Sequence, residues 1–396
     1  MQNIDEKPVL VVGGGLGGLA FAAALGLKGR KVMVMEQASE IAPIGYGIQL
    51  GPNVFRVFDQ LGVTEKVMAL TDFPDALVMR DAETGEILLP VELKSARFKE
   101  RFERAYVVIH RGDMHDVLLN ACNEIPTVEL VTSATVTGYE QNDSGVTVTC
   151  EDGRVFVGSA IVGADGIRSR IRGTIVGEER ATPIGYVAHR TILPMSEVPI
   201  GYNLNDVVCW AGPTYHVVHY PLRHSNLFNI VAVFKTDSLD ATPGNPAYRS
   251  VLDKAFSGAH PDLRKLIAKM DVHQRWVLAD RPPVRNWSNG LVTLLGDAAH
   301  PTLQSYAQGA CMALEDAAIL ANILEKNGYE YSRTFLEYQK RRLARTARVQ
   351  LGSRTMWDFY HSDGIARDVR DYDICNRKQD DTYNCLAWLW DGVSLN

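Results

Sequence analysis

Glycines and carboxylates gather in three short segments of the sequence, and together these two residue types can bind a nucleotide. The segments read GGGLGG at residues 13–18, GADG at 163–166 and GDAAHP at 296–301. Glycine-rich turns let backbone N–H groups approach a phosphate, while a carboxylate accepts hydrogen bonds from ribose hydroxyls. A shared nucleotide site would therefore require three distant parts of the chain to converge.

The first segment has the spacing of a dinucleotide-binding turn, G-x-G-x-x-G, at Gly13, Gly15 and Gly18. The first glycine permits a tight turn out of a strand, the second lets the backbone contact a pyrophosphate, and the third lets the next helix pack closely on the sheet. Glu36 ends the following strand, where an acid favours an adenosine ribose without a 2′-phosphate, as in FAD or NAD. The residues expected to contact the nucleotide here are Gly13, Gly15, Leu16, Gly18, Glu36 and Gln37.

Strands and a helix in the right order must position this turn. Residues 8–12 and 31–36 are short apolar runs rich in valine, and residues 17–28 between them have a helical pattern. This order predicts a β–α–β unit whose glycines lie between the first strand and the helix.

Two further groups of strands are expected. Strands at residues 127–132 and 146–150, with turn residues 142–145 between them, predict an antiparallel meander, and another strand is expected over 155–162.

Later in the chain, alternating runs at residues 216–222 and 228–234 predict a separate antiparallel sheet. Residues 308–348 predict helices. The second sheet and these helices would complete a mixed fold around the β–α–β unit.

Composition and charge exclude several classes of protein. With 396 residues, 46% of them hydrophobic and 22% charged, the chain is expected to form two closely packed globular domains. A net charge of −6 argues against nucleic acid or an anionic membrane surface as the main partner, and no apolar run reaches the roughly 20 residues of a membrane span. Because the six cysteines lack metal-ligand spacing and the first residues make a poor secretory signal, we expect reduced thiols, no metal and a cytoplasmic location.

In order and separation, the three segments resemble the class A flavoprotein monooxygenases, the para-hydroxybenzoate hydroxylase-like family. That family has a GxGxxG turn for the ADP half of FAD, a central DG motif (here Asp165-Gly166) and a GD motif (here Gly296-Asp297) contacting the flavin ribose. The single dinucleotide fingerprint agrees with a family in which NAD(P)H binds only transiently. The resemblance covers essentially the whole chain and implies an α/β (α+β) fold, in which a Rossmann-type GR2 FAD-binding domain is interleaved with an antiparallel-sheet substrate domain and followed by C-terminal helices. The implied parts are an FAD-binding domain over 1–75, 100–180 and 276–335, a substrate-binding domain over 76–99 and 181–275, and a C-terminal helical segment over 336–396.

The same resemblance implies further contacts with FAD. Asp297 is expected to bind the ribityl chain, and Arg111 is expected to reach the pyrophosphate. The backbone at Gln308, Gly309 and Ala310 is expected to approach the isoalloxazine ring, where a helix N-terminus would stabilise an anionic reduced flavin.

A strand with alternating faces predicts the substrate pocket, because it places His216 and Tyr220 on one side. Together with Tyr106 and Gln304, they resemble the ring-binding set of 3-hydroxybenzoate 6-hydroxylases, a histidine, two tyrosines and a glutamine. The resemblance implies an enzyme that uses NADH and O2 to hydroxylate a small aromatic acid, in particular 3-hydroxybenzoate to 2,5-dihydroxybenzoate (gentisate), with oxygen activated at C4a of the reduced flavin. His216 is the expected base, since histidine titrates near neutral pH and a phenolate is attacked faster at its para carbon. Gln304 and Tyr220 are expected to hold the phenol or the carboxylate, and Tyr106 to line the cavity.

Several alternatives stay open. A salicylate 1-hydroxylase or a 6-hydroxynicotinate 3-monooxygenase would use the same core, a flavin dehydrogenase or reductase would not insert oxygen, and a non-catalytic flavin-binding regulator would show no substrate-stimulated NADH oxidation. The choice between NADH and NADPH is open too, as is the partner of the substrate carboxylate, for which Arg223 is a candidate by proximity although a surface salt bridge is its commoner role. The family often forms homodimers, and the aromatic stretch Trp388-Leu389-Trp390 either packs at such an interface or closes the core.

Overall fold

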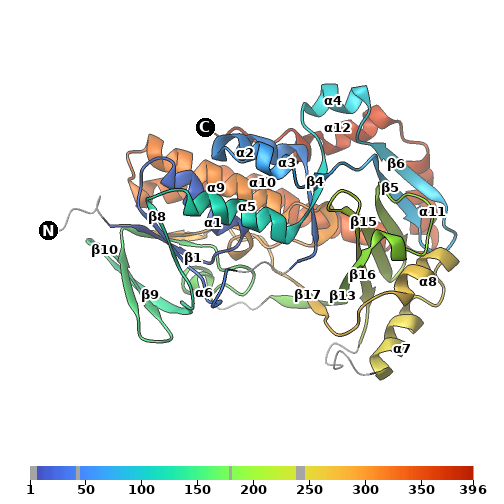
Figure 1. Cartoon of the computed structure of the whole chain (residues 1–396), viewed down its shortest axis with the longest axis horizontal. Helices are drawn as coiled ribbons and strands as arrows, with labels where there is room; N and C mark the ends of the chain where they lie inside the picture. Colours follow the sequence, from blue (N-terminus) through green and yellow to red (C-terminus); the bar gives the residue numbers. More distant parts are fainter. Residues whose placement is uncertain (1–6, 42–44, 178–180, 238–245, 396) are drawn as a thin grey trace.

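The computed structural model describes residues 7–41, 45–177, 181–237 and 246–395, and it contains two large sheets with a layer of long helices (Figure 1). The first sheet has six strands in the order β18-β19-β12-β1-β2-β8. All of its pairs are parallel except the short β18–β19 pair. Its strands are β1 (Val9–Val12), β2 (Val32–Met35), β8 (Val128–Val131), β12 (Ala160–Gly163), β18 (Ser288–Asn289) and β19 (Val292–Leu294).

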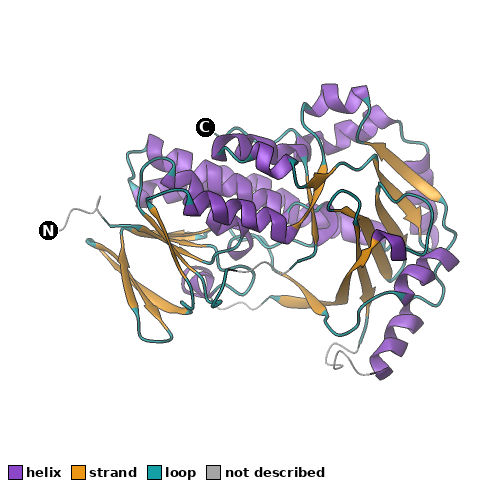
Figure 2. Cartoon of the chain, viewed as in Figure 1, coloured by secondary structure: helices purple, strands orange, loops and turns teal. Residues whose placement is uncertain are grey.

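Long helices cover one face of this sheet, and a small meander covers the other (Figures 1 and 2). α1 is buried along its whole length and packs against α5 and α9, which explains why its sequence is apolar on every side. The expected β–α–β unit is confirmed, because α1 follows the glycine turn directly and leads to β2. These helices are α1 (Leu16–Gly26), α5 (Arg111–Asn123), α9 (Gly309–Lys326) and α10 (Tyr331–Tyr360).

The meander differs from the sequence prediction in two places. The run at 127–132 does not join it, because β8 pairs in parallel with β2 at the edge of the first sheet, and β9 instead pairs with β10 across the expected turn. The run at 155–162 divides at Ser159 into β11, in the meander, and β12, in the parallel sheet. Local periodicity identifies a strand but not its partner, so both corrections depend on long-range pairing. The meander strands are β9 (Val136–Asn142), β10 (Gly145–Cys150) and β11 (Val155–Gly158).

The second large sheet has seven strands in the order β17-β13-β16-β15-β14-β5-β6. Its pairs are antiparallel except β5–β14, and the runs expected at 216–222 and 228–234 are confirmed as β15 and β16. Its strands are β5 (Ala76–Asp81), β6 (Ile87–Glu92), β13 (Thr182–Pro194), β14 (Val207–Gly212), β15 (Tyr215–Leu222), β16 (Leu227–Lys235) and β17 (Trp276–Asp280).

A small sheet, short helices and 3-10 turns make up the rest of the regular structure. The small sheet has the strand order β3-β7-β4, and its strands are β3 (Gly47–Leu50), β4 (Thr71–Asp72) and β7 (Val107–His110). The remaining helices are α2 (Phe55–Leu61), α3 (Thr64–Met68), α4 (Ala96–Phe102), α6 (Arg170–Val176), α7 (Pro246–Ala255), α8 (Pro261–Ala268), α11 (Gly364–Cys375) and α12 (Gln379–Trp390). Single 3-10 turns occur at η2 (Pro52–Val54), η3 (Met195–Glu197), η4 (Gly296–Ala298) and η5 (Gln304–Tyr306).

The aromatic C-terminus packs within its own chain. Trp390, at the end of α12, is buried, with its ring centroid 5.8 Å from Phe98, 5.3 Å from Phe102 and 5.4 Å from Tyr106. The stretch at residues 388–390 had two expected roles, packing at a dimer interface or closing the core, and the structure shows that it packs in the core. In the described ranges, no helix is both long enough and apolar enough to cross a membrane.

Candidate active site

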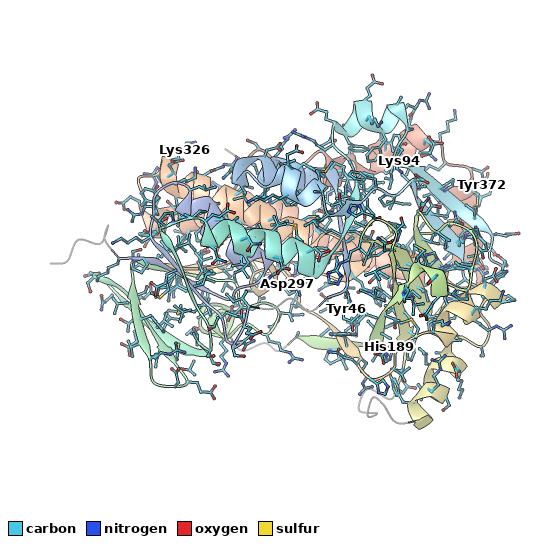
Figure 3. The ribbon with its side chains drawn as sticks, viewed as in Figure 1. Tyr46, Lys94, His189, Asp297, Lys326 and Tyr372 are labelled. Atoms are coloured by element: carbon cyan, nitrogen blue, oxygen red, sulfur yellow. The ribbon has the colours of Figure 1, made fainter. Side chains whose placement is uncertain are left out.

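A cavity of about 710 Å³ lies where the carboxyl ends of the parallel strands face the antiparallel sheet. Its wall contains residues from all three glycine- and acid-bearing segments and from β15, so the expected nucleotide and ring sites are continuous. Figure 3 shows Asp297 and Tyr46 at this junction. The expected site residues that line the cavity are Gly15, Leu16, Tyr106, Arg111, Gly166, His216, Tyr220, Gly296, Asp297, Gln304, Gly309 and Ala310. The other expected residues, which lie outside this lining, are Gly13, Gly18, Glu36, Gln37, Asp165 and Gln308.

The three glycines of the first turn differ in the space that a side chain would find at each position. Gly13 has φ = 108°, and a Cβ there would come 2.5 Å from the carbonyl oxygen of Ala164. A Cβ at Gly18 would collide with the carbonyl oxygen of Gly13, whereas Gly15 has open space beyond its Cα at the cavity wall. The turn is therefore closed at its first and third glycines and open at its second, which fits a pyrophosphate laid against backbone N–H groups.

Glu36 is held at the end of β2 beside this turn. Its Oε2 accepts a hydrogen bond from the Gly14 N–H at 2.8 Å, and its Oε1 accepts one from the Ala38 N–H at 2.9 Å. The neighbouring Gln37 is exposed. The fixed carboxylate lies where the adenosine ribose of a bound dinucleotide is placed in this type of fold.

The DG segment contributes backbone rather than a carboxylate to the cavity. Asp165 Oδ2 accepts hydrogen bonds from the N–H groups of Arg170 and Ile171 at 2.8 and 3.3 Å, at the start of α6. Burial raises the pKa of Asp165, and its Oδ1 has no hydrogen-bond partner among the described residues. Ala164 and Gly166 on either side line the cavity.

In the GD segment, by contrast, the carboxylate itself faces the cavity. The side chain of Asp297 is open to the cavity yet lies deep in the molecule, and this burial raises its pKa, while His300 and Arg111 lower it. Burial and the nearby charge of Arg190 lower the pKa of Arg111. Asp297 can accept hydrogen bonds from a polyhydroxyl chain, and Arg111 can pair with a phosphate, so both fit FAD.

Behind the GD segment lies an ion-pair cluster that the sequence analysis missed. Asp316 accepts from the Gly296 N–H at 3.1 Å, lies 2.7 Å from His300 Nε2, and accepts from Arg342 Nε at 2.6 Å. The pKa of Asp316 is lowered because the neighbouring positive charges outweigh its burial. Glu315 binds both Arg342 and Arg345, at 2.8 and 2.7 Å. The available signal was the pair of adjacent acids within an apolar stretch of helix α9.

At the other end of the cavity, the alternation expected along β15 is confirmed. His216, Val218 and Tyr220 line the cavity. Val217 packs in the core on the opposite face, and His219 accepts a hydrogen bond from Trp210 Nε1 at 3.1 Å.

The polar groups at this end form a chain of contacts across four elements, β13, η5, β15 and the C-terminal end of α10. The Nε2 atom of Gln304 lies 3.5 Å from Nε2 of His216, and Arg190 donates to the amide oxygen of Gln304 at 3.4 Å. On its other side, Nδ1 of His216 lies 3.0 Å from Nε2 of His361. Burial lowers the pKa of His216 well below its usual range, and His361 lowers it further, so the ring is neutral near pH 7. A neutral imidazole at this place can accept a proton.

The two tyrosines of the expected set are phenols rather than phenolates. Tyr106 donates to Gln49 Oε1 at 2.6 Å. Burial raises the pKa of both Tyr106 and Tyr220, while Arg190 partly opposes the rise at Tyr220. Both can therefore donate a hydrogen bond in the cavity at neutral pH.

The two arginines near this end differ in their partners. Arg223 donates to Asp113 at 3.0 and 2.7 Å and is partly exposed, so the surface salt bridge considered for it is confirmed. Arg190 lines the cavity, burial lowers its pKa, and among the described residues no carboxylate forms an ion pair with it. Arg190 and His361 were not predicted from the sequence, because each is a single polar residue with no motif around it.

Comparison with known proteins agrees with this geometry. Residues 6–352 match the family described as FAD binding domain. The chain is 41% identical to the 3-hydroxybenzoate 6-hydroxylase of Polaromonas naphthalenivorans (strain CJ2), over 98% of this chain and 97% of that relative. It is 32% identical to the 6-hydroxynicotinate 3-monooxygenase of Bordetella bronchiseptica, over 88% of this chain and 91% of that relative. Among solved structures, Klebsiella pneumoniae HpxO complexed with FAD and uric acid matches with a TM-score of 0.86 at 25% identity, over 98% of this chain and 97% of that chain.

The parallel sheet with its glycine turn, the second antiparallel sheet and the continuous cavity between them define a class A FAD-dependent monooxygenase. The chain belongs to this FAD-binding family, and it is a FAD-dependent aromatic hydroxylase.

Proposed function

We propose that the enzyme hydroxylates 3-hydroxybenzoate to 2,5-dihydroxybenzoate, with NADH as the electron donor and O2 as the oxygen source. The observation that carries this proposal is the pairing, across Gln304, of a neutral histidine with the guanidinium of Arg190, which forms no ion pair with a carboxylate of the described residues. A substrate with one phenol and one carboxylate supplies what each group lacks, a proton for His216 and an anion for Arg190. The relative named 3-hydroxybenzoate 6-hydroxylase supports the choice of isomer.

Different residues of the chain would bind the cofactor, take the phenol proton and orient the substrate. FAD, when bound along the glycine turn, Asp297 and Arg111, supplies the activated oxygen. His216 takes the phenol proton at Nε2, which pushes electron density towards the ring carbon para to the hydroxyl, the 6 position of 3-hydroxybenzoate. Arg190 pairs with the carboxylate, which orients the ring.

The rest of the wall would keep the ring in place and the site dry. Tyr220 and Gln304 line the same cavity, and each would donate to the phenol or to the carboxylate of such a substrate. Tyr106 and the apolar side chains of α12, including Leu389 and Trp390, line the cavity and limit the access of water.

Steady-state NADH oxidation, measured with each hydroxybenzoate isomer, salicylate and 6-hydroxynicotinate and followed by product identification, tests the proposal. We expect stimulation by 3-hydroxybenzoate, one O2 consumed per NADH, and 2,5-dihydroxybenzoate as the product. Release of CO2 from salicylate, or turnover of 6-hydroxynicotinate in preference, would instead assign one of the two related hydroxylase activities. Replacing NADH with NADPH in the same assay identifies the electron donor.

A further inference from the structure

His361 lies beside the expected base although 145 positions separate the two residues. It follows the last residue of α10 as the helix C-cap, and its backbone N–H donates to the Trp357 carbonyl at 3.2 Å. Its ring stacks on Tyr186, with centroids 5.0 Å apart and planes 23° apart, and meets Trp357 edge-on at 4.9 Å. Helix α10 and strand β13 therefore hold the imidazole in one orientation against His216.

The hydrogen bonds around His216 indicate which of its nitrogens carries the proton. Arg190 has only donors, so the atom of Gln304 that it contacts is the amide oxygen, and the amide nitrogen faces Nε2 of His216. An amide nitrogen can only donate, so Nε2 of His216 must accept, and in a neutral ring the proton is then on Nδ1. That proton points at Nε2 of His361, 3.0 Å away.

We propose that His361 is a positioning residue for the hydroxylation: its Nε2 accepts the Nδ1–H of His216 and thereby keeps the Nε2 lone pair of His216 directed at the substrate phenol. This inference rests on the proposed function, in which that lone pair takes the phenol proton. The arrangement is that of an oriented histidine base, with a second imidazole in the place where a carboxylate commonly lies.

The proton transfer balances within this pair. The phenol O–H bond breaks and its electron pair stays on the oxygen, while a new N–H bond forms at Nε2 of His216. The resulting imidazolium keeps its Nδ1–H bond to the neutral ring of His361, and the proton returns to the product phenolate after the oxygen has been transferred. Burial also lowers the pKa of His361, to about 4, so this ring is available as an acceptor at neutral pH.

The groups packed around the pair make a neutral partner preferable to a charged one. Arg190 reaches His216 only through Gln304, and Tyr186 and Trp357 cover His361. Within the described part of the chain, no carboxylate forms an ion pair with either histidine. A carboxylate in place of His361 would add a buried negative charge beside the base, whereas a neutral imidazole orients the base without adding one.

Two variants of the holoenzyme test this inference. His361→Phe keeps an aromatic ring between Tyr186 and Trp357 but removes the acceptor, and His361→Gln restores an acceptor on a flexible side chain. We expect His361→Phe to bind FAD and 3-hydroxybenzoate as the wild type does, with kcat lowered about tenfold, KM unchanged and the acidic limb of the kcat–pH profile displaced. His361→Gln should recover most of the lost kcat.

His219→Phe is the matched control, because His219 is a buried histidine on the opposite face of the same strand. It should lower the thermal stability and leave the pH profile of kcat in place. If His361→Phe keeps the wild-type kcat and pH profile, or if both variants change the same parameters, the inference is wrong.

A readout without turnover separates this inference from the proposed function. In protein labelled with ¹⁵N-histidine, the imidazole nitrogens of His216, assigned with a His216→Phe sample, should report a proton on Nδ1 in the wild type and a shift towards Nε2 in His361→Phe. An unchanged tautomer overturns the inference. Failure of every hydroxybenzoate to stimulate the wild type would overturn the proposed substrate, while the tautomer measurement would still decide the role of His361.

Discussion

Two buried histidines lie at opposite ends of the cavity in different electrostatic settings. His300, behind the nucleotide end, contacts a carboxylate that also binds Arg342 and the Gly296 N–H. His216, at the substrate end, contacts a second imidazole and a neutral amide, and Arg190 beyond it has no carboxylate partner among the described residues. The cluster behind the nucleotide end pairs its charges inside the protein, whereas the guanidinium of Arg190 at the substrate end is left for an anionic ligand.

The difference follows from what each end must do. Paired buried charges hold their neighbours in place, because removing one partner leaves the other without compensation. The Gly296 backbone and helix α9 are tied together by such a cluster, which makes a rigid support for the bound cofactor. A buried guanidinium without a carboxylate partner carries a desolvation cost that an anionic substrate can relieve, so it favours binding and specificity instead.

The largest effect on stability is expected from removing a cation of the ion-pair cluster behind the nucleotide end. Arg342→Met would leave Glu315 and Asp316 as buried carboxylates with fewer cationic partners, and we expect a loss of about 3–5 kcal/mol in the free energy of unfolding together with weaker FAD retention. Urea unfolding and the flavin content of the purified protein would measure both. Glu325→Gln, which removes an exposed ion pair with Lys28, is the control and should cost about 1 kcal/mol or less. Equal effects of the two variants would show that the cluster does not support the fold.

Removing the base at the substrate end of the cavity should reduce the rate of hydroxylation rather than the stability of the fold. We expect His216→Ala to lower kcat about 10²- to 10⁴-fold while FAD content is retained, since a positioned general base commonly contributes this much. The measurement is single-turnover product formation with 3-hydroxybenzoate. Unchanged turnover with an unchanged pH profile would show that His216 is not the base.

Neutralising Arg190 should affect binding more than rate. In Arg190→Gln, KM for 3-hydroxybenzoate is expected to rise about 10- to 100-fold, the range for a lost charge-assisted hydrogen bond of roughly 1.5–3 kcal/mol. The uncharged analogue 3-hydroxybenzyl alcohol should be much less affected. Arg223→Gln, at the surface pair with Asp113, is the matched control and should change neither. If Arg190→Gln loses FAD while its substrate affinity is retained, the anion that it binds belongs to the cofactor.

The smallest effect concerns pH and a histidine outside the cavity. Burial lowers the pKa of His219 to about 3, from about 6.5 in an unfolded chain. Between these values the unfolded state binds more protons than the native state, so the stability from this group is complete above pH 6.5 and falls as the pH falls towards 3. We expect the wild type to lose about 1 kcal/mol more than His219→Phe between pH 6.5 and 5.5, measured by urea unfolding. Parallel curves for the two proteins would show that His219 does not titrate in this way.

Part of this organisation follows from local sequence. The G-x-G-x-x-G turn between β1 and α1 is confirmed, because glycine spacing and strand–helix periodicity are properties of neighbouring residues. The alternation that puts His216 and Tyr220 on one face of β15 is confirmed for the same reason. The domain boundaries, the homodimer, the cytoplasmic location and the roles of the individual site residues stay predictions.

Tertiary structure alone decided which strands and side chains meet. β8 belongs to the parallel sheet rather than the meander because its partner is β2, far away in the sequence. Arg190 reaches the cavity through its register in β13, and His361 reaches His216 because α10 runs its full length across the molecule before it ends beside β15. Periodicity and motif spacing describe the order of residues along the chain. Which distant groups share a buried space depends on how the helices and the two sheets pack together.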